Sequence, residues 1–155
     1  MQENNRPLLA ETTFRVRFAE TDQMGIVHHA SYLVYFEEGR SELSRQHGMP
    51  YSELERMGYS LALSEAYVRY RMPAVYDDLI TVRTWVEQLR SRGITFAYEV
   101  VRAEDGQVLV TGRTAHICVD RSGQARRLPD TWIAPYRQAM AGHAVDGSTG
   151  AAGQQ

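Results

Sequence analysis

The densest group of reactive side chains is the run Glu20 to His29, E-T-D-Q-M-G-I-V-H-H. It lies between a segment with strand-like alternation and a segment with helical spacing. A loop at that position brings its carboxylates next to a helix N-terminus, where free N–H groups and the helix dipole favour negative charge. Such N–H groups can bind an oxyanion without any special side chain. Asp22 could then act as general base or nucleophile, and Gly25 lets the backbone approach a ligand closely.

Each of these residues also has a purely structural interpretation. An aspartate in a turn commonly forms an Asx-turn or caps a helix. His28 and His29 are adjacent, so their side chains are expected to point apart on a helix. Two histidines without a third ligand make a weak zinc signal. The run by itself therefore leaves both a catalytic and a structural role open for Asp22, and it predicts no metal site.

Composition and charge indicate one globular domain that does not coat nucleic acid. The chain has 155 residues, of which 43% are hydrophobic and 23% charged, with a net charge of −2. A lone cysteine, Cys118, excludes an internal disulfide and a cysteine-based zinc cluster, and it suits a reducing compartment. The polar N-terminus has no signal-peptide core, and no apolar run reaches the roughly 18 residues of a membrane span. We therefore expect a cytoplasmic protein.

Alternation of apolar and polar residues predicts five strands. In the first, residues 13–19, Phe14, Val16 and Phe18 alternate with arginines. The other four are expected at 61–71, 79–89, 94–101 and 108–119. The pair Asp105-Gly106 is a strong hairpin signal between the last two, so the final three strands are expected to form an antiparallel meander.

A stripe of residues at helical spacing predicts one long helix over 29–46. Gly48 and Pro50 are typical of the end of a helix, and a short second helix is expected over 51–57. The stripe consists of Tyr32, Phe36, Gly39 and Leu43.

These elements predict an α+β domain over residues 12–140. One face of a five-stranded antiparallel sheet must be covered, and the long helix is available to cover it. The open sheet edges favour pairing with a second copy, and hence a homo-oligomer. Residues 1–11 are expected to be a flexible N-terminus, and residues 141–155, rich in Gly and Ala, a disordered tail.

The run from Phe14 to Arg40 resembles the hotdog-fold acyl-CoA thioesterases of the 4-hydroxybenzoyl-CoA type, which include the bacterial Tol–Pal-associated enzymes. Their pattern is an Asp, a Gly-apolar-Val run, H-x-x-Y at the start of a long helix, and Y-x-E-x-x-R within it. The resemblance extends over about residues 13–129. The matching residues are Asp22, Gly25-Ile26-Val27, His29-Ala30-Ser31-Tyr32, Tyr35-Phe36-Glu37-Glu38-Gly39-Arg40, Tyr70-Arg71-Met72-Pro73-Ala74 and Arg90-Ser91-Arg92-Gly93.

The resemblance implies a hotdog fold, in which a five-stranded antiparallel sheet wraps around one long helix. It also implies a homodimer or homotetramer with the active site at the dimer interface. By the same resemblance, Asp22 is the catalytic carboxylate, as nucleophile or as general base. The backbone N–H of His29 would polarise the thioester carbonyl. The substrate would be an acyl-CoA, so CoA is part of the substrate, and neither a cofactor nor a metal is implied.

Substrate contacts can be assigned around this motif. The acyl group is expected to contact Met24, Ile26 and Tyr32, with His28 as a polar, titratable rim. All 17 basic residues are arginines, whose guanidinium groups bind phosphates in a bidentate manner. The CoA phosphates are expected at Arg90 and Arg92. A second arginine pair, Arg126 and Arg127, is the alternative.

Two other functions compete with thioester hydrolysis. A hotdog enoyl-CoA hydratase resembles an Asp-x-x-x-x-His motif, but the residue five positions after Asp22 is Val27. A non-catalytic acyl-CoA sensor or scaffold would need the fold but not Asp22, and neither end of the chain resembles an output segment. Hydrolysis is therefore favoured.

Overall fold

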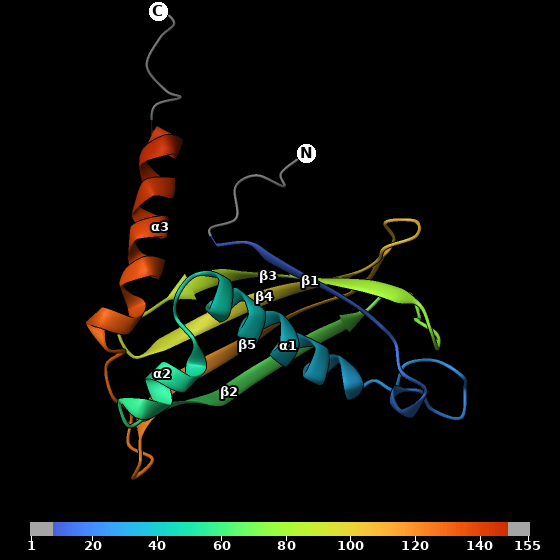
Figure 1. Cartoon of the computed structure of the whole chain (residues 1–155), viewed down its shortest axis with the longest axis horizontal. Helices are drawn as coiled ribbons and strands as arrows, with labels where there is room; N and C mark the ends of the chain where they lie inside the picture. The colour runs from blue at the N-terminus through green and yellow to red at the C-terminus, as the bar shows by residue number, and fades with distance from the viewer. Residues whose placement is uncertain (1–7, 149–155) are drawn as a thin grey trace, which may run out of the picture.

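The computed structural model describes residues 8–148, in which a single curved sheet wraps around a long helix (Figure 1). The expected α+β hotdog fold is confirmed. The strands are β1 (Ala10–Arg15), β2 (Tyr59–Tyr70), β3 (Leu79–Leu89), β4 (Gly93–Arg102) and β5 (Val108–Asp120). The helices are α1 (Ser31–Gln46), α2 (Tyr51–Arg56) and α3 (Asp130–Ser148), with a 3-10 turn, η1, at Phe18–Glu20.

The sheet is antiparallel throughout, with the strand order β1-β3-β4-β5-β2. The predicted meander of β3, β4 and β5 is confirmed. At the expected β4–β5 hairpin, Gly106 has a φ of 71°, and the N–H of Gln107 donates to the Asp105 carboxylate at 3.1 Å. β2 forms one edge of the sheet, and most of its side chains are exposed.

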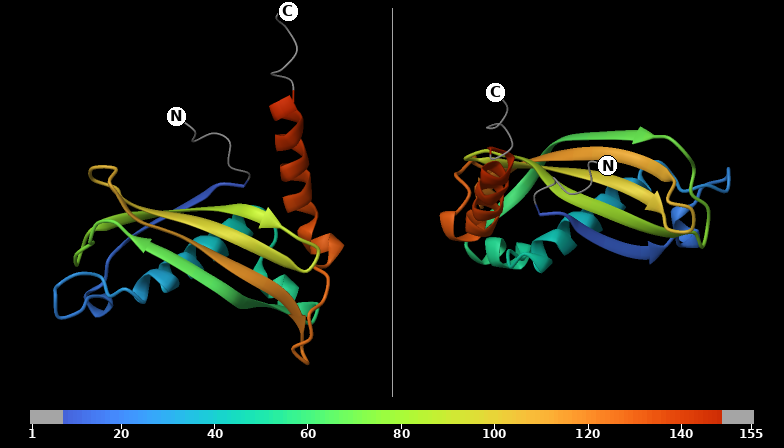
Figure 2. Two further views of the ribbon diagram at one scale, coloured as in Figure 1. Left: turned by 180° about the vertical axis from the view of Figure 1, so that it is seen from behind. Right: turned by 90° about the horizontal axis from the view of Figure 1, so that it is seen from above.

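α1 lies across the inner side of the curved sheet, and the other side of the sheet is not covered by this helix (Figure 2). The predicted stripe is buried, and Phe36 stacks on Tyr98 of β4 at 4.2 Å between ring centroids. Gly39 allows close approach, because a Cβ there would collide with the Thr84 hydroxyl. The helix and sheet therefore meet at a fixed distance, which holds the start of α1 beside the end of β2.

The first strand differs from its prediction. β1 spans Ala10–Arg15 rather than 13–19, and the expected inward residue Phe18 is 76% exposed. Glu20 is the cause, since its carboxylate accepts hydrogen bonds from the Arg17 N–H (2.7 Å) and the Arg17 guanidinium (2.9 Å). This local pairing bends the chain into η1 and overrides the alternation.

The C-terminal helix α3 was not predicted. Pro135 lies inside it, and proline normally argues against a helix interior. The helix is anchored by Trp132, Ile133 and Tyr136, which are buried, and the Trp132 indole N–H donates to the Pro50 carbonyl at 3.2 Å. It then leaves the body of the molecule (Figures 1 and 2) and continues over 141–148, part of the segment expected to be disordered. The rest of that segment, like residues 1–7, lies outside the described residues.

Candidate active site

Residues 20–29 form a tight loop between η1 and α1. Thr21 and Val27 form an antiparallel bridge, and the Asp22 N–H donates to the Ile26 carbonyl at 2.9 Å. Gly25 closes the turn by donating its N–H to the Asp22 carbonyl at 2.9 Å. Its φ of 77° is a conformation that glycine adopts without strain. Gly25 therefore shapes the loop that carries Asp22.

The loop is fixed to the rest of the protein on two sides. On one side, the Val27 N–H donates to the carbonyl of the buried residue Ala74 at 2.9 Å. On the other, the Glu20 carbonyl accepts the His28 N–H at 2.8 Å, and the Glu20 carboxylate accepts the Tyr35 hydroxyl at 2.9 Å. Burial, together with this carboxylate, raises the pKa of Tyr35 far above its usual range, so the phenol stays a donor. Sequence reasoning had not singled out Glu20.

The Asp22 carboxylate keeps most of its hydrogen-bonding capacity. Oδ1 accepts the Met24 N–H at 2.8 Å, which is the Asx-turn considered as its structural role. Among the described side chains of residues 8–142 no other hydrogen bond or ion pair reaches this carboxylate, and Asp22 lines a cleft of about 340 Å³. The structural role therefore uses one oxygen and leaves the other available to a ligand.

His29, just before α1, lines the same cleft. The His28 carbonyl accepts the Ser31 N–H at 2.9 Å, so this carbonyl points toward the first turn of α1. The N–H of a trans peptide points opposite to its carbonyl, which directs the His29 N–H away from the helix. In the described part of the chain it donates no hydrogen bond, and His29 lines the cleft. It is a backbone donor without a protein acceptor.

The two histidines differ from expectation. α1 begins at Ser31, so neither His28 nor His29 is helical, and their rings lie 4.1 Å apart rather than pointing away from each other. His28 is exposed and is not among the residues that line the cleft. Its Nδ1 instead accepts the Ala30 N–H at 3.2 Å. The structure thus gives His28 a role in shaping the start of the helix.

The cleft brings together the residues expected to contact the acyl group, and it adds a wall from the end of β2. Tyr32 is buried at its base, whereas Met24 is 76% exposed at its mouth. The motif Tyr70-Arg71-Met72-Pro73 was noticed in the sequence but had no role assigned. The cleft is lined by Asp22, Met24, Ile26, Val27, His29, Tyr32, Tyr70, Arg71, Met72 and Pro73.

Arg102 supports this wall from behind. Its guanidinium donates to the Pro73 carbonyl at 3.1 Å and lies 3.6 Å from the Asp78 carboxylate. Asp78 in turn accepts the Val75 N–H at 3.0 Å, and Val75 bridges to Ile26 of the Asp22 loop. The β4–β5 hairpin therefore positions the cleft through these contacts.

The arginines expected to bind CoA lie elsewhere. Arg90 and Arg92 line a separate hollow of about 470 Å³ at the β3–β4 turn. The hollow reaches β2 at Ser64 and Glu65, whereas the cleft lies at Tyr70, five residues or roughly 17 Å further along that strand at the usual rise per residue. Arg126, from the alternative pair, is held by Asp120 at 2.8 Å. A single chain does not unite these arginines with Asp22.

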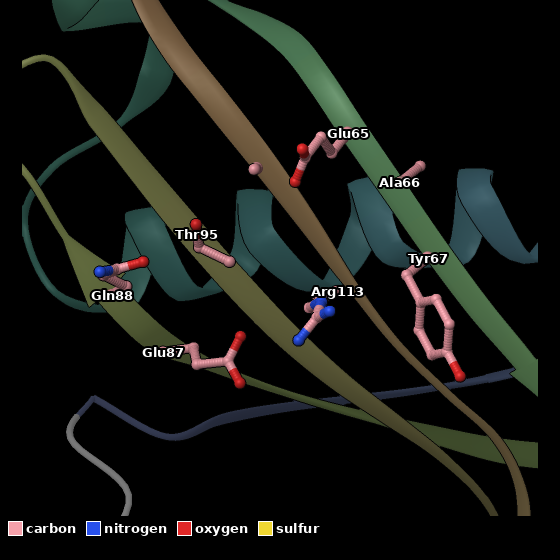
Figure 3. Close-up of a pocket in the computed structure, with 8 residues that line it drawn as sticks. Glu65, Ala66, Tyr67, Glu87, Gln88, Thr95 and Arg113 are labelled. Atoms are coloured by element: carbon pink, nitrogen blue, oxygen red, sulfur yellow. The ribbon is translucent and has the colours of Figure 1, made fainter.

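Another hollow, of about 480 Å³, lies on the sheet face away from α1 (Figure 3). Its charged side chains come from three strands, and the Arg113 guanidinium lies 5.4 Å from the centre of the Tyr67 ring. It contains mixed charges and no helix start, so it lacks the combination found at Asp22. The labelled residues are Glu65, Ala66, Tyr67, Glu87, Gln88, Thr95 and Arg113.

Among the described side chains, those of residues 8–142, no group of three His, Cys, Asp or Glu is arranged to hold a metal ion. Over residues 8–148 no helix combines the length and the apolar character needed to cross a membrane.

A five-stranded antiparallel sheet wrapped around one long helix defines a hotdog protein, and Asp22 and His29 lie together at one cleft of this fold. Residues 16–135 match the family described as the thioesterase-like superfamily, and the chain belongs to that superfamily. The expected enzyme class, a thioester hydrolase, is confirmed.

Three similar proteins illustrate the relationship. "Putative acyl-CoA thioesterase YneP" of Bacillus subtilis strain 168 is 33% identical over 84% of this chain and 97% of its own. The acyl-CoA thioester hydrolase YbgC of Escherichia coli O157:H7 is 30% identical over 80% of this chain and 92% of its own. The crystal structure of DHNA-CoA thioesterase from Staphylococcus aureus has a TM-score of 0.81 at 27% identity, covering 94% of this chain and 97% of its own.

Proposed function

We propose that the protein hydrolyses an acyl-CoA thioester to the free acid and CoA. One observation carries the proposal: Asp22 and His29 line one cleft, the Asp22 carboxylate accepts a single hydrogen bond from the residues described, and the His29 N–H donates none to them. The names of the relatives support the substrate class. No cofactor or metal takes part in this proposal.

The chemistry needs a nucleophile and a place for the developing negative charge. In one route, Asp22 attacks the thioester carbonyl carbon, the C–S bond breaks, and CoA leaves as thiolate; water then hydrolyses the mixed anhydride and restores the carboxylate. In the other, Asp22 takes a proton from the water that attacks the carbonyl carbon, the C–S bond breaks, and CoA leaves as a thiolate that takes up this proton. In both, the His29 N–H stabilises the oxyanion. A thiol has a pKa of about 8.5, so the leaving group needs no strong general acid.

The acyl group would lie against Met24, Ile26 and Tyr32. Tyr32 and Tyr70 meet edge to face at 5.7 Å between ring centroids, an aromatic surface suited to an aryl group. We therefore propose that the protein belongs to the 4-hydroxybenzoyl-CoA type of thioesterase, which includes the Tol–Pal-associated enzymes. His28 would influence substrate binding only indirectly, through its hydrogen bond to the Ala30 N–H just before α1.

Assembly would bring the arginines to the cleft. β2 is an edge strand, with Leu63, Tyr67 and Tyr70 about half exposed. Antiparallel pairing of two β2 edges would set the Tyr59 end of one chain beside the Tyr70 end of the other. Arg90 and Arg92 of the partner subunit would then face the Asp22 cleft and could hold the CoA phosphates. We propose such a homodimer, or a homotetramer built from it, acting in the cytoplasm.

Thiol release from a panel of aryl-CoA and aliphatic acyl-CoA esters tests the proposal. We expect turnover by the wild type, with the panel ranking the acyl groups. Burial raises the pKa of the Cys118 thiol, so a no-substrate control should show little reaction of the protein with the thiol reagent. Binding of CoA esters without any turnover would replace the hydrolase with a sensor or scaffold. Hydration of enoyl-CoA without thiol release would favour the hydratase.

A further inference from the structure

Tyr70, the last residue of β2, makes a contact that the proposed chemistry does not yet use. Its hydroxyl donates to the His29 carbonyl at 2.9 Å. The ring lies edge-on to buried Tyr32, which fixes its direction, although Tyr70 itself is 50% exposed. The side chain therefore links the end of an edge strand to the residue just before α1.

His29 lies between two peptide groups, and each is held in a different way. The preceding peptide is fixed by the 2.9 Å bond from the Ser31 N–H to the His28 carbonyl. The following peptide, which contains the His29 carbonyl, is held by Tyr70 and by the Ala30 N–H, whose bond to the exposed His28 ring is longer, at 3.2 Å. Removal of the Tyr70 hydroxyl would leave only this longer bond on that side.

We infer that Tyr70 is a positioning residue for the oxyanion donor, acting through the His29 carbonyl to keep the His29 N–H directed into the cleft. The inference rests on the proposed function for its kinetic consequence, but its structural content concerns His29 alone. Burial raises the pKa of Tyr70 above its usual value, so the hydroxyl remains protonated and can donate at neutral pH.

The ring and the hydroxyl of Tyr70 have separable roles. The ring lines the cleft and would contact the acyl group, which affects ground-state binding. The hydroxyl is committed to a backbone carbonyl, so it would affect the transition state through the N–H geometry. Tyr70→Phe keeps the ring and removes only the hydroxyl. Tyr76→Phe is a matched control, because the Tyr76 hydroxyl forms no hydrogen bond with the side chains described, those of residues 8–142, and its ring packs on Phe18.

The kinetic test compares these two variants with wild type on the best acyl-CoA ester. For Tyr70→Phe we expect kcat to fall roughly three- to tenfold, as for the loss of one hydrogen bond, with KM within about twofold and an unchanged Tm. Tyr76→Phe should match wild type. A raised KM at constant kcat would make Tyr70 a binding wall only and would overturn the inference, as would wild-type kinetics.

A second readout does not depend on activity. In isotope-labelled protein, the 13C signal of the His29 carbonyl should move upfield in Tyr70→Phe and stay in place in Tyr76→Phe. An unchanged signal in Tyr70→Phe would overturn the inference whatever the kinetics. If the wild type hydrolyses no ester, the proposed function fails, and the carbonyl signal alone decides whether Tyr70 holds the His29 peptide.

Discussion

Two turns at opposite ends of β2, residues 22–25 and 120–123, share the sequence pattern D-x-x-G and the same backbone conformation. Asp22 accepts the N–H of the residue two positions on at 2.8 Å, and Asp120 does so at 2.9 Å. Gly25 and Gly123 have φ angles of 77° and 83°, and each donates its N–H to the aspartate carbonyl. The two turns therefore have the same internal hydrogen bonds, yet their carboxylates have different surroundings.

The Asp120 carboxylate is surrounded by donors. It also accepts the Ser122 hydroxyl at 2.6 Å, the Gln124 N–H at 3.1 Å and the Arg126 guanidinium at 2.8 Å. The Ser122 hydroxyl and then Arg126 hold the pKa of Asp120 far below its usual range. Asp22 has one donor and a cleft instead. The difference shows that the turn alone does not leave a carboxylate free to bind a ligand. Asp22 is available because, among the described residues, it has no donor besides the Met24 N–H.

The largest expected effect distinguishes the two aspartates directly. Asp22→Asn should lower kcat by about a thousandfold or more, because the reacting carboxylate is lost while the Asx-turn can be kept by the amide oxygen. Asp120→Asn should keep kcat within about twofold and lower Tm, since it weakens a charged pair. Thiol-release kinetics and thermal unfolding of both variants measure this. Similar kcat values for Asp22→Asn and wild type would end the assignment of Asp22.

The next largest effect concerns Arg90 and Arg92, the arginines at the β3–β4 turn. The double variant Arg90→Ala, Arg92→Ala should raise KM for CoA esters about tenfold with little change in kcat, because phosphate contacts act equally on ground and transition states. Arg137→Ala, which breaks only the exposed pair with Asp130, serves as control. A short thioester without phosphates should show no difference between the variants. An unchanged KM for CoA esters would remove Arg90 and Arg92 from the site.

A smaller effect, on the free energy of unfolding, is expected from the buried side chain of His116, which lies on β5 near Asp120. Burial, reinforced by Arg40, lowers the pKa of His116 to about 4, and its Nε2 bonds to Thr114 at 2.8 Å. The unfolded chain takes up this proton near pH 6.5 and the folded chain only near pH 4. The free energy of unfolding should therefore fall as pH drops from about 6.5 to 4. Thermal melts across this range should be flatter for His116→Gln; identical slopes would contradict the assignment.

The smallest effect is a matched glycine pair. Gly25→Ala and Gly123→Ala each place a Cβ in open space at positive φ, so each should cost about 1 kcal/mol of stability from backbone strain. Only Gly25→Ala should also reduce turnover, because it shifts the loop that carries Asp22. Urea unfolding and kcat of the two variants test this. Equal effects on kcat would mean that the Asp22 turn has no special place in the chemistry.

Local patterns predicted much of the fold and the centre of the candidate site. The alternation of β3 and the stripe of α1 depend on burial of one face, and both are confirmed. The run from Asp22 to His29 is short enough for its own glycine and turn bonds to shape it. Long-range contacts were missed: Tyr70 reaches His29 only because the end of β2 meets the start of α1. A local hydrogen bond at Glu20 overrode the alternation in the first strand, and no periodic pattern predicted α3.

The oxyanion donor proposed at position 29 is a main-chain group, and this affects how the protein can change over generations. Nineteen of the twenty amino acids carry an N–H, so a substitution of His29 would leave the donor in place unless it introduced proline. At position 29 the donor itself thus survives nearly every codon change, even one that removes the imidazole of the family pattern, whereas at position 22 the proposed chemistry depends on the side chain. Descendants that had lost this chemistry would be recognised by the loss of the aspartate, or by proline at position 29.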